Sequence, residues 1–255
     1  MTNDLLARAK LLAGTPSGNP PKQLGTPQSI YSTLAGGLDV YIAFDTTGSM
    51  DSTISKVRKN IGTITTALLD GKSDIRLSIN GVGDHCDGEY LLQLYHLSKN
   101  PAEVRGAIEN IVMTHGGDEP EAYECLAVSL AKRIPLESAG RKRAVVLIGD
   151  SYPHGMRDAP CVQNVDYKTA FSALKTLCDG FYMVGCEPQH YSLQRQLITA
   201  GNDKERFIEL GDMNGILCEL LVALARKTQS PLSLEQYLKS LGSDKSNTIR
   251  GLLGR

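Results

Sequence analysis

Tryptophan is absent from this 255-residue chain, and all aromatic residues together make up only 5% of it. Aromatic stacking is the usual sequence-tolerant means of holding single-stranded nucleic acid, so this scarcity argues against such a ligand. An excess of charge is also missing, because 27 Lys and Arg stand against 28 Asp and Glu, for a formal net charge of -1. So balanced a chain has no electrostatic attraction for nucleic acid or an anionic membrane, and we expect neither as a partner.

Long apolar runs are missing too. No stretch approaches the roughly 20 apolar residues that span a bilayer, and the longest, residues 144–149, has the length of a strand. Charged residues interrupt the first ten positions, so we expect no signal peptide. The six cysteines are dispersed, and no two have the two-residue spacing that is typical of metal ligands. These features predict a soluble, cytoplasmic protein with reduced thiols.

What the chain does contain is an alternation of apolar strands and amphipathic helices between residues 38 and 228. Residues 38–44 are β-branched and aromatic, as in a buried strand, and the helix after them carries an apolar stripe from Met50 to Leu68. Further strands are predicted at 75–82, 89–97, 144–148, 181–186 and 206–210, and helices at 101–112, 119–134, 169–178, 192–200 and 213–226. The polar loop 83–88 is short enough for a hairpin. This order predicts an α/β fold with a doubly wound, Rossmann-like, mostly parallel sheet, one antiparallel edge strand and helices on both faces.

The two ends differ from this alternating region. Residues 1–37 include a stretch rich in proline and glycine, and we expect a short helix followed by an extended arm. Residues 229–255 form a basic tail in which 232–241 can fold as a short amphipathic helix. For this tail three alternatives stay open: a solvated segment, a helix folded onto the domain, or a docking segment for a partner.

Polar side chains gather where the predicted strands end. Asp45, Thr47 and Ser49 occupy alternate positions after the first strand, Asp150 follows the central strand, and Asp118 lies in a polar loop ahead of a helix. Ligands of doubly wound sheets bind outside the carboxyl ends of the strands. Carboxylate and hydroxyl oxygens suit a hard cation such as Mg²⁺. Singly, the hydroxyls and Asp118 could equally cap helices; together they predict a metal site.

Four segments resemble the von Willebrand factor type A domain family. The first is Leu-Asp-Val-Tyr-Ile-Ala-Phe-Asp-Thr-Thr-Gly-Ser-Met at residues 38–50, which resembles the opening of such a domain. The others are Gly-Asp-His-Cys-Asp-Gly-Glu at 83–89, His-Gly-Gly-Asp-Glu-Pro-Glu-Ala at 115–122, and Val-Leu-Ile-Gly-Asp-Ser-Tyr-Pro-His-Gly at 146–155. These three look most like the intracellular subgroup found in α-kinase-associated and bacterial proteins. The likeness covers roughly residues 38–228.

The resemblance implies a metal-ion-dependent adhesion site that holds Mg²⁺ or Mn²⁺. Carried over by position, its ligands are Asp45, Thr47, Ser49, Asp118 and Asp150, with Asp118 standing where most members have threonine. A third carboxylate bound directly would make the site net negative, so we expect Asp118 to act through water or to cap a helix. The family's usual activity is cation-dependent binding of a protein partner, whose carboxylate completes the coordination sphere.

Intracellular relatives often act as assembly or adaptor subunits beside AAA+ ATPases, kinases or phosphatases, and the resemblance therefore implies a binding module rather than an enzyme. We expect its partner-binding rim to contain Asp84, His85, His115, Glu119 and His154. His85 beside Asp84, Cys86 and Asp87 also resembles a transition-metal cluster. Adjacent residues on a hairpin loop point in different directions, however, which argues against an independent site there.

Two other functions stay open. A Mg²⁺ held by Asp45, Asp118 and Asp150, with His154 nearby, could hydrolyse a phosphate ester. Against this, the sequence has no phosphate-binding glycine loop with lysine and no Gly-x-Ser-x-Gly nucleophile. Thr47 also stands where aspartyl-phosphate phosphatases carry their second aspartate. The last alternative is a structural subunit whose metal site stays empty.

Overall fold

The computed structural model describes residues 37–69, 74–157, 159–198 and 206–253. The predicted N-terminal segment 1–37 lies outside the described residues, apart from Gly37. The predicted alternation is present, with boundaries shifted by a few residues. In chain order the elements are β1 (Leu38–Asp45), α3 (Ile54–Leu68), β2 (Ile75–Val82), β3 (Leu92–Leu94), α4 (Pro101–Asn110), α5 (Tyr123–Glu137), β4 (Lys142–Gly149), α6 (Tyr167–Thr176), β5 (Gly180–Gly185), α7 (Tyr191–Ile198), β6 (Phe207–Glu209), α8 (Cys218–Gln229), α9 (Pro231–Ser240) and α10 (Ser243–Leu252).

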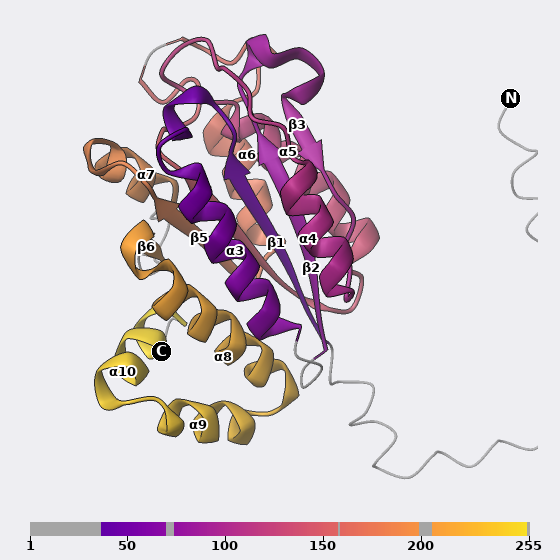
Figure 1. Cartoon of the computed structure of the whole chain (residues 1–255), viewed down its shortest axis with the longest axis vertical. Helices are drawn as coiled ribbons and strands as arrows, with labels where there is room; N and C mark the ends of the chain where they lie inside the picture. Colours follow the sequence, from indigo (N-terminus) through magenta and orange to yellow (C-terminus); the bar gives the residue numbers. More distant parts are fainter. Residues whose placement is uncertain (1–36, 70–73, 158, 199–205, 254–255) are drawn as a thin grey trace, which may run out of the picture. The chain divides into compact units, whose positions relative to one another are not determined.

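Six strands form one sheet in the order β3-β2-β1-β4-β5-β6 (Figure 1). β1 lies between β2 and β4 and is parallel to both, and β5 and β6 continue the parallel arrangement. β3 pairs antiparallel with β2 at one edge. This confirms the predicted mostly parallel α/β sheet with one antiparallel edge strand.

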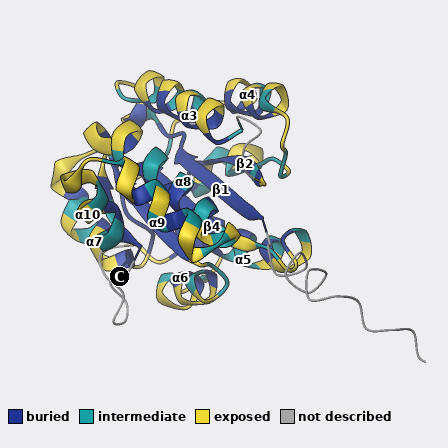
Figure 2. Ribbon diagram, turned by 90° about the horizontal axis from the view of Figure 1, so that it is seen from below, coloured by how far each residue is buried: buried dark blue, intermediate teal, exposed yellow. Residues whose placement is uncertain are grey.

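Helices cover both faces of the sheet, because alternate side chains of each buried strand point in opposite directions. Ile42 and Val146 belong to a core shared with α3, α4 and α8, whereas Tyr41 and Val145 belong to a core shared with α5, α6 and α7. Figure 2 shows the buried sheet between these two layers. The connection from β1 to β2 lies on one face and the connection from β4 to β5 on the other, so the order in which strands are added to the sheet reverses between the parallel neighbours β1 and β4. Such a switch point is where ligands of open α/β sheets bind.

The segment between β2 and β3 differs from the hairpin loop that its polar sequence predicts. Residues 85–90 form a 3₁₀ helix, and β3 keeps only three residues. Asp84 starts this helix, because its carboxylate accepts a hydrogen bond from the backbone N–H of His85 at 2.6 Å, while Asp87 accepts one from the N–H of Asp84 at 2.7 Å. Such a reciprocal cap satisfies the first N–H groups of a helix. The hydrophobic pattern gives no sign of it.

The C-terminal helices are part of the domain core. Ser230 caps α9, where its hydroxyl accepts a hydrogen bond from the N–H of Ser233 at 3.0 Å. Leu234, Leu238 and Ile249 are at most 1% exposed and pack with α8. Of the alternatives for the tail, the structure shows a helix folded onto the domain, together with α10, which the sequence pattern does not predict.

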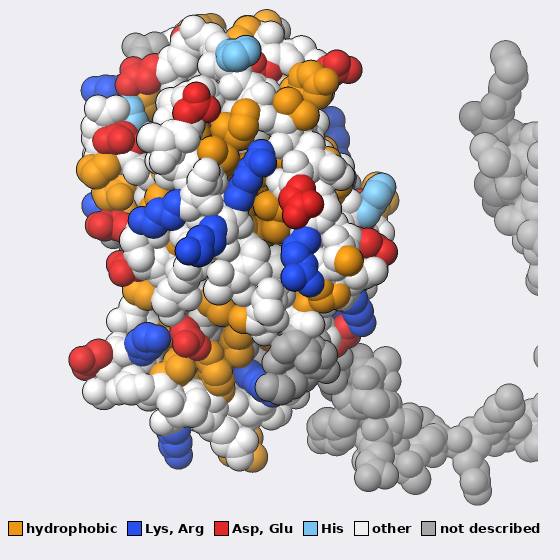
Figure 3. Space-filling model, in the orientation of Figure 1, with side chains coloured by type: hydrophobic (Ala, Val, Ile, Leu, Met, Phe, Trp, Pro, Cys, Tyr) orange, Lys and Arg blue, Asp and Glu red, His pale blue; other side chains and the backbone are white. Residues whose placement is uncertain are grey.

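The described helices have no membrane-spanning candidate, since none is both long and apolar enough to cross a bilayer. On the face that α3, α4 and α8 cover, acidic and basic side chains are interspersed rather than gathered by sign (Figure 3). All six cysteines are free, and two of them, Cys125 and Cys161, are buried.

Candidate functional site

Asp45, the last residue of β1, is fully buried at the carboxyl end of the sheet. Its Oδ1 accepts hydrogen bonds from the backbone N–H of Thr47 at 2.8 Å and from the Thr47 hydroxyl at 2.6 Å. Its Oδ2 accepts one from the hydroxyl of Tyr123, at the start of α5, at 2.5 Å. Burial, and then the neighbouring Asp150 carboxylate, raise the pKa of Asp45 to about 7. These hydrogen bonds orient the carboxylate, and no Lys or Arg among the described residues forms an ion pair with it.

Tyr123 reaches Asp45 across the end of β4, and only glycine leaves room for it there. A Cβ atom on Gly149 would lie 2.1 Å from the tyrosine oxygen and 3.4 Å from the Cβ of Asp45. Gln194 holds the same stretch of backbone, because its side-chain amide donates to the carbonyl of Gly149 at 3.0 Å and to that of Ser151 at 2.9 Å. The end of β4 is thereby fixed against the end of β1.

Asp150 follows β4 directly and lies beside this group. It is 9% exposed, and its Oδ1 is buried without a hydrogen-bond partner among the described residues. Burial raises the pKa of Asp150, and a hydrogen bond from Ser49 opposes this. The Ser49 hydroxyl, which is exposed, lies 3.3 Å from the Thr47 hydroxyl. Thr47, Ser49 and Asp150 line a pocket of about 480 Å³.

Glu121 and Glu187 are acidic residues that line this pocket and that the sequence does not single out. Glu187 is exposed, whereas Glu121 is 3% exposed and its Oε2 has no hydrogen-bond partner in the described part of the chain. Burial, and then the nearby Asp45, raise the pKa of Glu121 to about 10. Its backbone N–H donates to the carbonyl of Tyr152 at 2.9 Å, and this bridge turns the side chain inward. The loop holds three acidic residues, and their sequence alone does not distinguish which one points inward.

Asp118 also lines the pocket, but at its outer side. Its side chain is 49% exposed, and Oδ1 lies 3.5 Å from Nε2 of His154. Helix α5 begins at Tyr123 with Ala122 in the N-cap position, so Asp118 does not cap it. Of the five metal ligands predicted, Asp45, Thr47, Ser49 and Asp150 are thus close neighbours, while Asp118 contacts a histidine.

The five residues predicted for the rim fall into two sets. His115 and Glu119 line the pocket, and Glu119 accepts a hydrogen bond from the Tyr152 hydroxyl at 3.1 Å. Asp84, His85 and His154 form a buried group instead, with side chains 5%, 8% and 4% exposed. The two imidazole rings lie 4.7 Å apart, and Nε2 of His154 is 3.4 Å from Oδ1 of Asp84.

The donor set at the pocket fits a hard divalent cation. The hydroxyls of Thr47 and Ser49 and the carboxylates of Asp150 and Glu121 line it, and oxygen is the ligand that Mg²⁺ and Mn²⁺ prefer. Buried polar atoms normally have a partner, yet Asp150 Oδ1 and Glu121 Oε2 have no hydrogen-bond partner among the described residues. A cation held there, with an open side toward the pocket, could bind one further anionic ligand.

Comparisons with known proteins add information on the fold alone. No family model matches the chain, and no curated protein is similar to it. A crystal structure of the pilus adhesin SpaC from Lactobacillus rhamnosus GG, in an open conformation, matches with a TM-score of 0.57 and 14% identity over 76% of this chain and 30% of the adhesin chain. A second SpaC structure matches with a TM-score of 0.53 and 13% identity over 84% and 31%. The chain spans just under a third of the adhesin's length, and the similarity establishes a shared α/β fold.

Proposed function

We propose that this chain is a von Willebrand A-type domain that binds Mg²⁺ or Mn²⁺ at the carboxyl edge of its sheet and, through the metal, a carboxylate of a protein partner. One observation carries the proposal: Thr47, Ser49 and Asp150 line one pocket with the buried Asp45 directly behind Thr47, and Asp150 keeps a buried oxygen without a hydrogen-bond partner among the described residues. The order of the four family-like segments and the α/β fold shared with an adhesin are consistent with it.

Each residue has a distinct role in this function. Thr47 and Ser49 offer neutral hydroxyls, Asp150 offers its free carboxylate oxygen, and Asp45 is held in place by Thr47 and Tyr123. A divalent ion supplies a positive charge that attracts an anionic group at the open side of the pocket. Asp118 does not cancel this attraction by itself, because His154 lies within ion-pair distance of it.

The proposed activity is binding, in the manner of an adaptor or assembly subunit beside an AAA+ ATPase, kinase or phosphatase in the cytoplasm. The phosphohydrolase alternative needs His154 at the metal as a proton carrier. That side chain is 4% exposed and packs between Glu124 and Asp84, outside the set of residues that line the pocket. This placement argues against His154 as the proton carrier of a hydrolytic site.

The decisive experiment is calorimetric titration of Mg²⁺ and Mn²⁺ into wild type, Ser49→Ala and Ser52→Ala. Both serines carry exposed hydroxyls in the segment after β1, but only Ser49 lines the pocket. We expect wild type and Ser52→Ala to bind one ion with equal affinity, and Ser49→Ala to bind about tenfold more weakly or worse. Wild type without saturable binding, or equal loss in both variants, would refute the site.

The partner's carboxylate can be tested with acetate as the probe. If the metal keeps an open position for an anion, acetate and Mn²⁺ must increase each other's affinity by the same factor, because linkage is reciprocal. We therefore expect a tighter Mn²⁺ titration in acetate than in chloride at equal ionic strength. Identical Mn²⁺ affinity in the two salts would count against carboxylate recognition while leaving metal binding established.

A further inference from the structure

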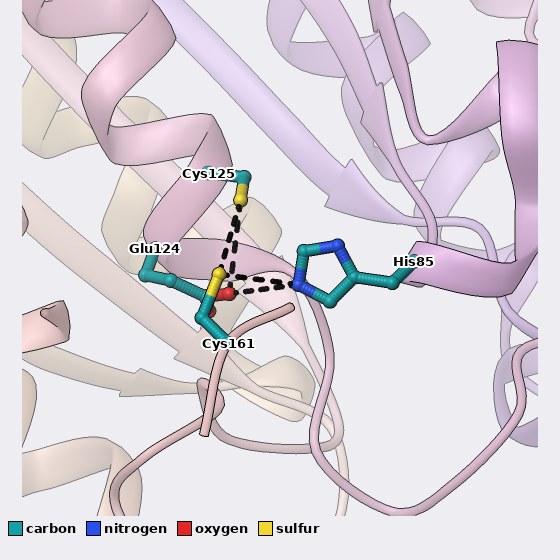
Figure 4. A group of neighbouring side chains, drawn as sticks. All are labelled: His85, Glu124, Cys125 and Cys161. Atoms are coloured by element: carbon teal, nitrogen blue, oxygen red, sulfur yellow. Dashed lines mark hydrogen bonds and ion pairs between the residues drawn. The ribbon is translucent and has the colours of Figure 1, made fainter. Parts of the chain in front are cut away.

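A second group of metal-binding side chains lies apart from the carboxyl-edge pocket. His85, Glu124, Cys125 and Cys161 each direct one ligand atom to a common point, and these atoms all lie within 4.8 Å of one another (Figure 4). His85 comes from the 3₁₀ helix after β2, Glu124 and Cys125 from the first turn of α5, and Cys161 from the loop between β4 and α6. Three segments far apart in the sequence therefore meet at this cluster.

Four of the six separations within the cluster are close to those of a tetrahedral metal site. The two sulfur atoms are 3.7 Å apart, Cys161 Sγ is 3.3 Å from His85 Nε2, and that nitrogen is 3.2 Å from Glu124 Oε1. Cys125 Sγ lies 3.8 Å from the same carboxylate oxygen. Ligands at ordinary zinc distances, about 2.3 Å for sulfur and about 2.0–2.2 Å for nitrogen and oxygen, form a tetrahedron with edges of about 3.4–3.8 Å.

We propose that His85, Glu124, Cys125 and Cys161 hold a Zn²⁺ ion in a closed, structural site. Two thiolates and an imidazole are borderline-soft ligands that select zinc over Mg²⁺ or Ca²⁺. Glu124 is fully buried, each cysteine is 4% exposed, and the His85 side chain is 8% exposed. Four protein ligands with almost no access to water are the mark of a structural rather than a catalytic zinc site.

The backbone around Cys161 is shaped to support a thiolate. Asn164 takes a left-handed conformation with φ of 55°, and its N–H donates to the carbonyl of Cys161 at 2.9 Å. This turn brings the N–H groups of Gln163 and Val165 toward the Cys161 sulfur, where they favour its charged form. Hydrogen bonds of this kind orient metal ligands in established sites.

Glu124 is anchored on its far side. Its Oε2 accepts a hydrogen bond from the backbone N–H of His154 at 3.2 Å, and Nδ1 of His154 lies 3.5 Å from Oε1. Burial lowers the pKa of His154, but the facing carboxylates of Glu124, Asp84 and Asp118 outweigh it and raise that pKa overall. His154 thus anchors Glu124 at the edge of the cluster through its backbone N–H and its ring.

The site has a defined task in the fold. It ties the 3₁₀ helix after β2 to the start of α5 and to the loop after β4. These segments also carry Asp84, Tyr123 and His154, which lie beside or beneath the carboxyl-edge pocket. Among the described residues, one β-bridge, between Glu121 and Pro153, joins the segment before α5 to the loop after β4. Zinc at this position would add a second connection between these segments.

A disulfide between Cys125 and Cys161 is the competing explanation, and the sulfur–sulfur distance argues against it. The separation of 3.7 Å far exceeds a bond of about 2.05 Å. A disulfide would also leave His85 and Glu124 without a reason to converge on the same point. The two explanations differ in what the purified protein contains, one metal ion or one oxidised pair.

The test starts with the full chain purified under reducing conditions with zinc present. Native mass spectrometry is expected to show one zinc per chain, and replacement by Co²⁺ to give the near-ultraviolet charge-transfer band of thiolate ligands with intense tetrahedral visible bands. Cobalt at the carboxyl-edge pocket has only oxygen ligands and gives no such band, so the two sites are distinguishable. Zinc uptake is expected to release protons, because both thiols must ionise.

Single substitutions test whether the cobalt spectrum and the zinc affinity come from the four proposed ligands. Cys125→Ser, Cys161→Ser and His85→Asn should each lose the tetrahedral cobalt spectrum or weaken zinc binding at least tenfold. Cys86→Ser is the matched control, since this cysteine adjoins His85 but is exposed, and it should keep both the spectrum and the affinity. Any of three results would overturn the proposal. Wild type could give no thiolate–cobalt band, the purified protein could contain a Cys125–Cys161 disulfide instead of zinc, or Cys86→Ser and Cys161→Ser could behave alike.

Discussion

The two ends of β1 each bury an aspartate, and the fold treats them in opposite ways. Asp39, near the amino end, receives hydrogen bonds from Arg76 at 2.8 and 2.5 Å and from Arg141 at 2.6 Å. Among the described residues, Asp45 at the carboxyl end receives hydrogen bonds from Thr47 and Tyr123, and it faces the carboxylates of Asp150 and Glu121. Both side chains are 0% exposed.

The pKa values follow this difference. Burial raises the pKa of Asp39, but hydrogen bonds from Arg76, Ser138 and Arg141, together with the charge of Arg141, outweigh it and lower that pKa overall. For Asp45, burial and the Asp150 charge act in the same direction, and the pKa rises to about 7. A buried charge is stable when it is paired and costly when it is not. The amino end of β1 is therefore self-sufficient, in the sense that the protein's own arginines compensate its buried charge. The carboxyl end is instead suited to a cation from outside.

The largest expected effect is on the self-sufficient end. Asp39→Asn should lower the free energy of unfolding by about 3 kcal/mol, because removing one partner of a buried ion pair leaves the others uncompensated. Arg76 and Arg141 are 27% and 18% exposed, so water relieves part of the cost. Urea denaturation monitored by circular dichroism measures the change.

Asp45→Asn, measured in the presence of chelator, tests whether the two ends of β1 differ in this way. It keeps the shape of the side chain while removing a negative charge that faces other carboxylates. We expect its free energy of unfolding to stay within about 1 kcal/mol of wild type or to rise. If it loses as much stability as Asp39→Asn, the carboxyl end is self-sufficient too, and the contrast between the ends is wrong.

A steric change at Gly149 comes next. Gly149→Ala places a Cβ atom 2.1 Å from the Tyr123 oxygen, so it should displace the donor that orients Asp45 and cost about 2 kcal/mol. Gly62→Ala is the control, because Gly62 lies in α3 with nothing within 4 Å of its added Cβ. That change should instead stabilise the protein by about 0.5–1 kcal/mol, since alanine favours helix. Equal effects at the two positions in urea denaturation would contradict the packing at Gly149.

Magnesium should stabilise the carboxyl end by an amount set by mass action. At a Mg²⁺ concentration of ten times the Kd, the native state gains about 1.4 kcal/mol. Asp150→Asn should abolish this gain, whereas Asp51→Asn, which removes an exposed carboxylate from the same segment as Ser49, should keep it. Thermal unfolding with Mg²⁺ and with chelator measures the difference. A gain that persists in Asp150→Asn would place the ion elsewhere.

The sequence was sufficient to predict the carboxyl edge because its signals are local. Continuous apolar runs such as residues 144–148 mark buried parallel strands, and parallel strands bring the residues after them to one edge. Asp45 and Asp150 could be placed together on that reasoning, and the structure puts them side by side. Glu121 could not, because its inward direction depends on a backbone bridge to the loop after β4.

The His85 cluster was beyond the reach of sequence reasoning for another reason. Its ligands are separated by up to 76 positions, from His85 to Cys161, and Cys125 and Cys161 are 36 apart, so no local spacing signals a metal site. Proximity in sequence drew attention to Cys86 and Asp87 as partners of His85, whereas the structure supplies Glu124 and Cys161. Helix α10 was missed because it is mostly polar, with Ile249 and Leu252 its buried residues.

The smallest expected effect is at Asp74, which joins the same basic cluster as Asp39 but on the surface. It receives a hydrogen bond from Arg141 at 2.7 Å and pairs with Lys99 at 2.5 Å, yet its side chain is 48% exposed. Asp74→Asn should therefore cost less than about 1 kcal/mol and lose its effect in high salt.

The contribution of Asp74 to the free energy of unfolding depends on pH with a definite sign. The hydrogen bond from Arg141, followed by that from Lys99, lowers the pKa of Asp74 from 3.8 to about 2. A carboxylate with a depressed pKa stabilises the native state above the unfolded pKa and loses this contribution as the pH falls through the folded one. The difference between wild type and Asp74→Asn should be constant above about pH 5 and vanish toward about pH 2. If Asp74→Asn costs as much as Asp39→Asn at neutral pH, charge pairing rather than burial sets the stability of the amino end, and Asp39 is not special there.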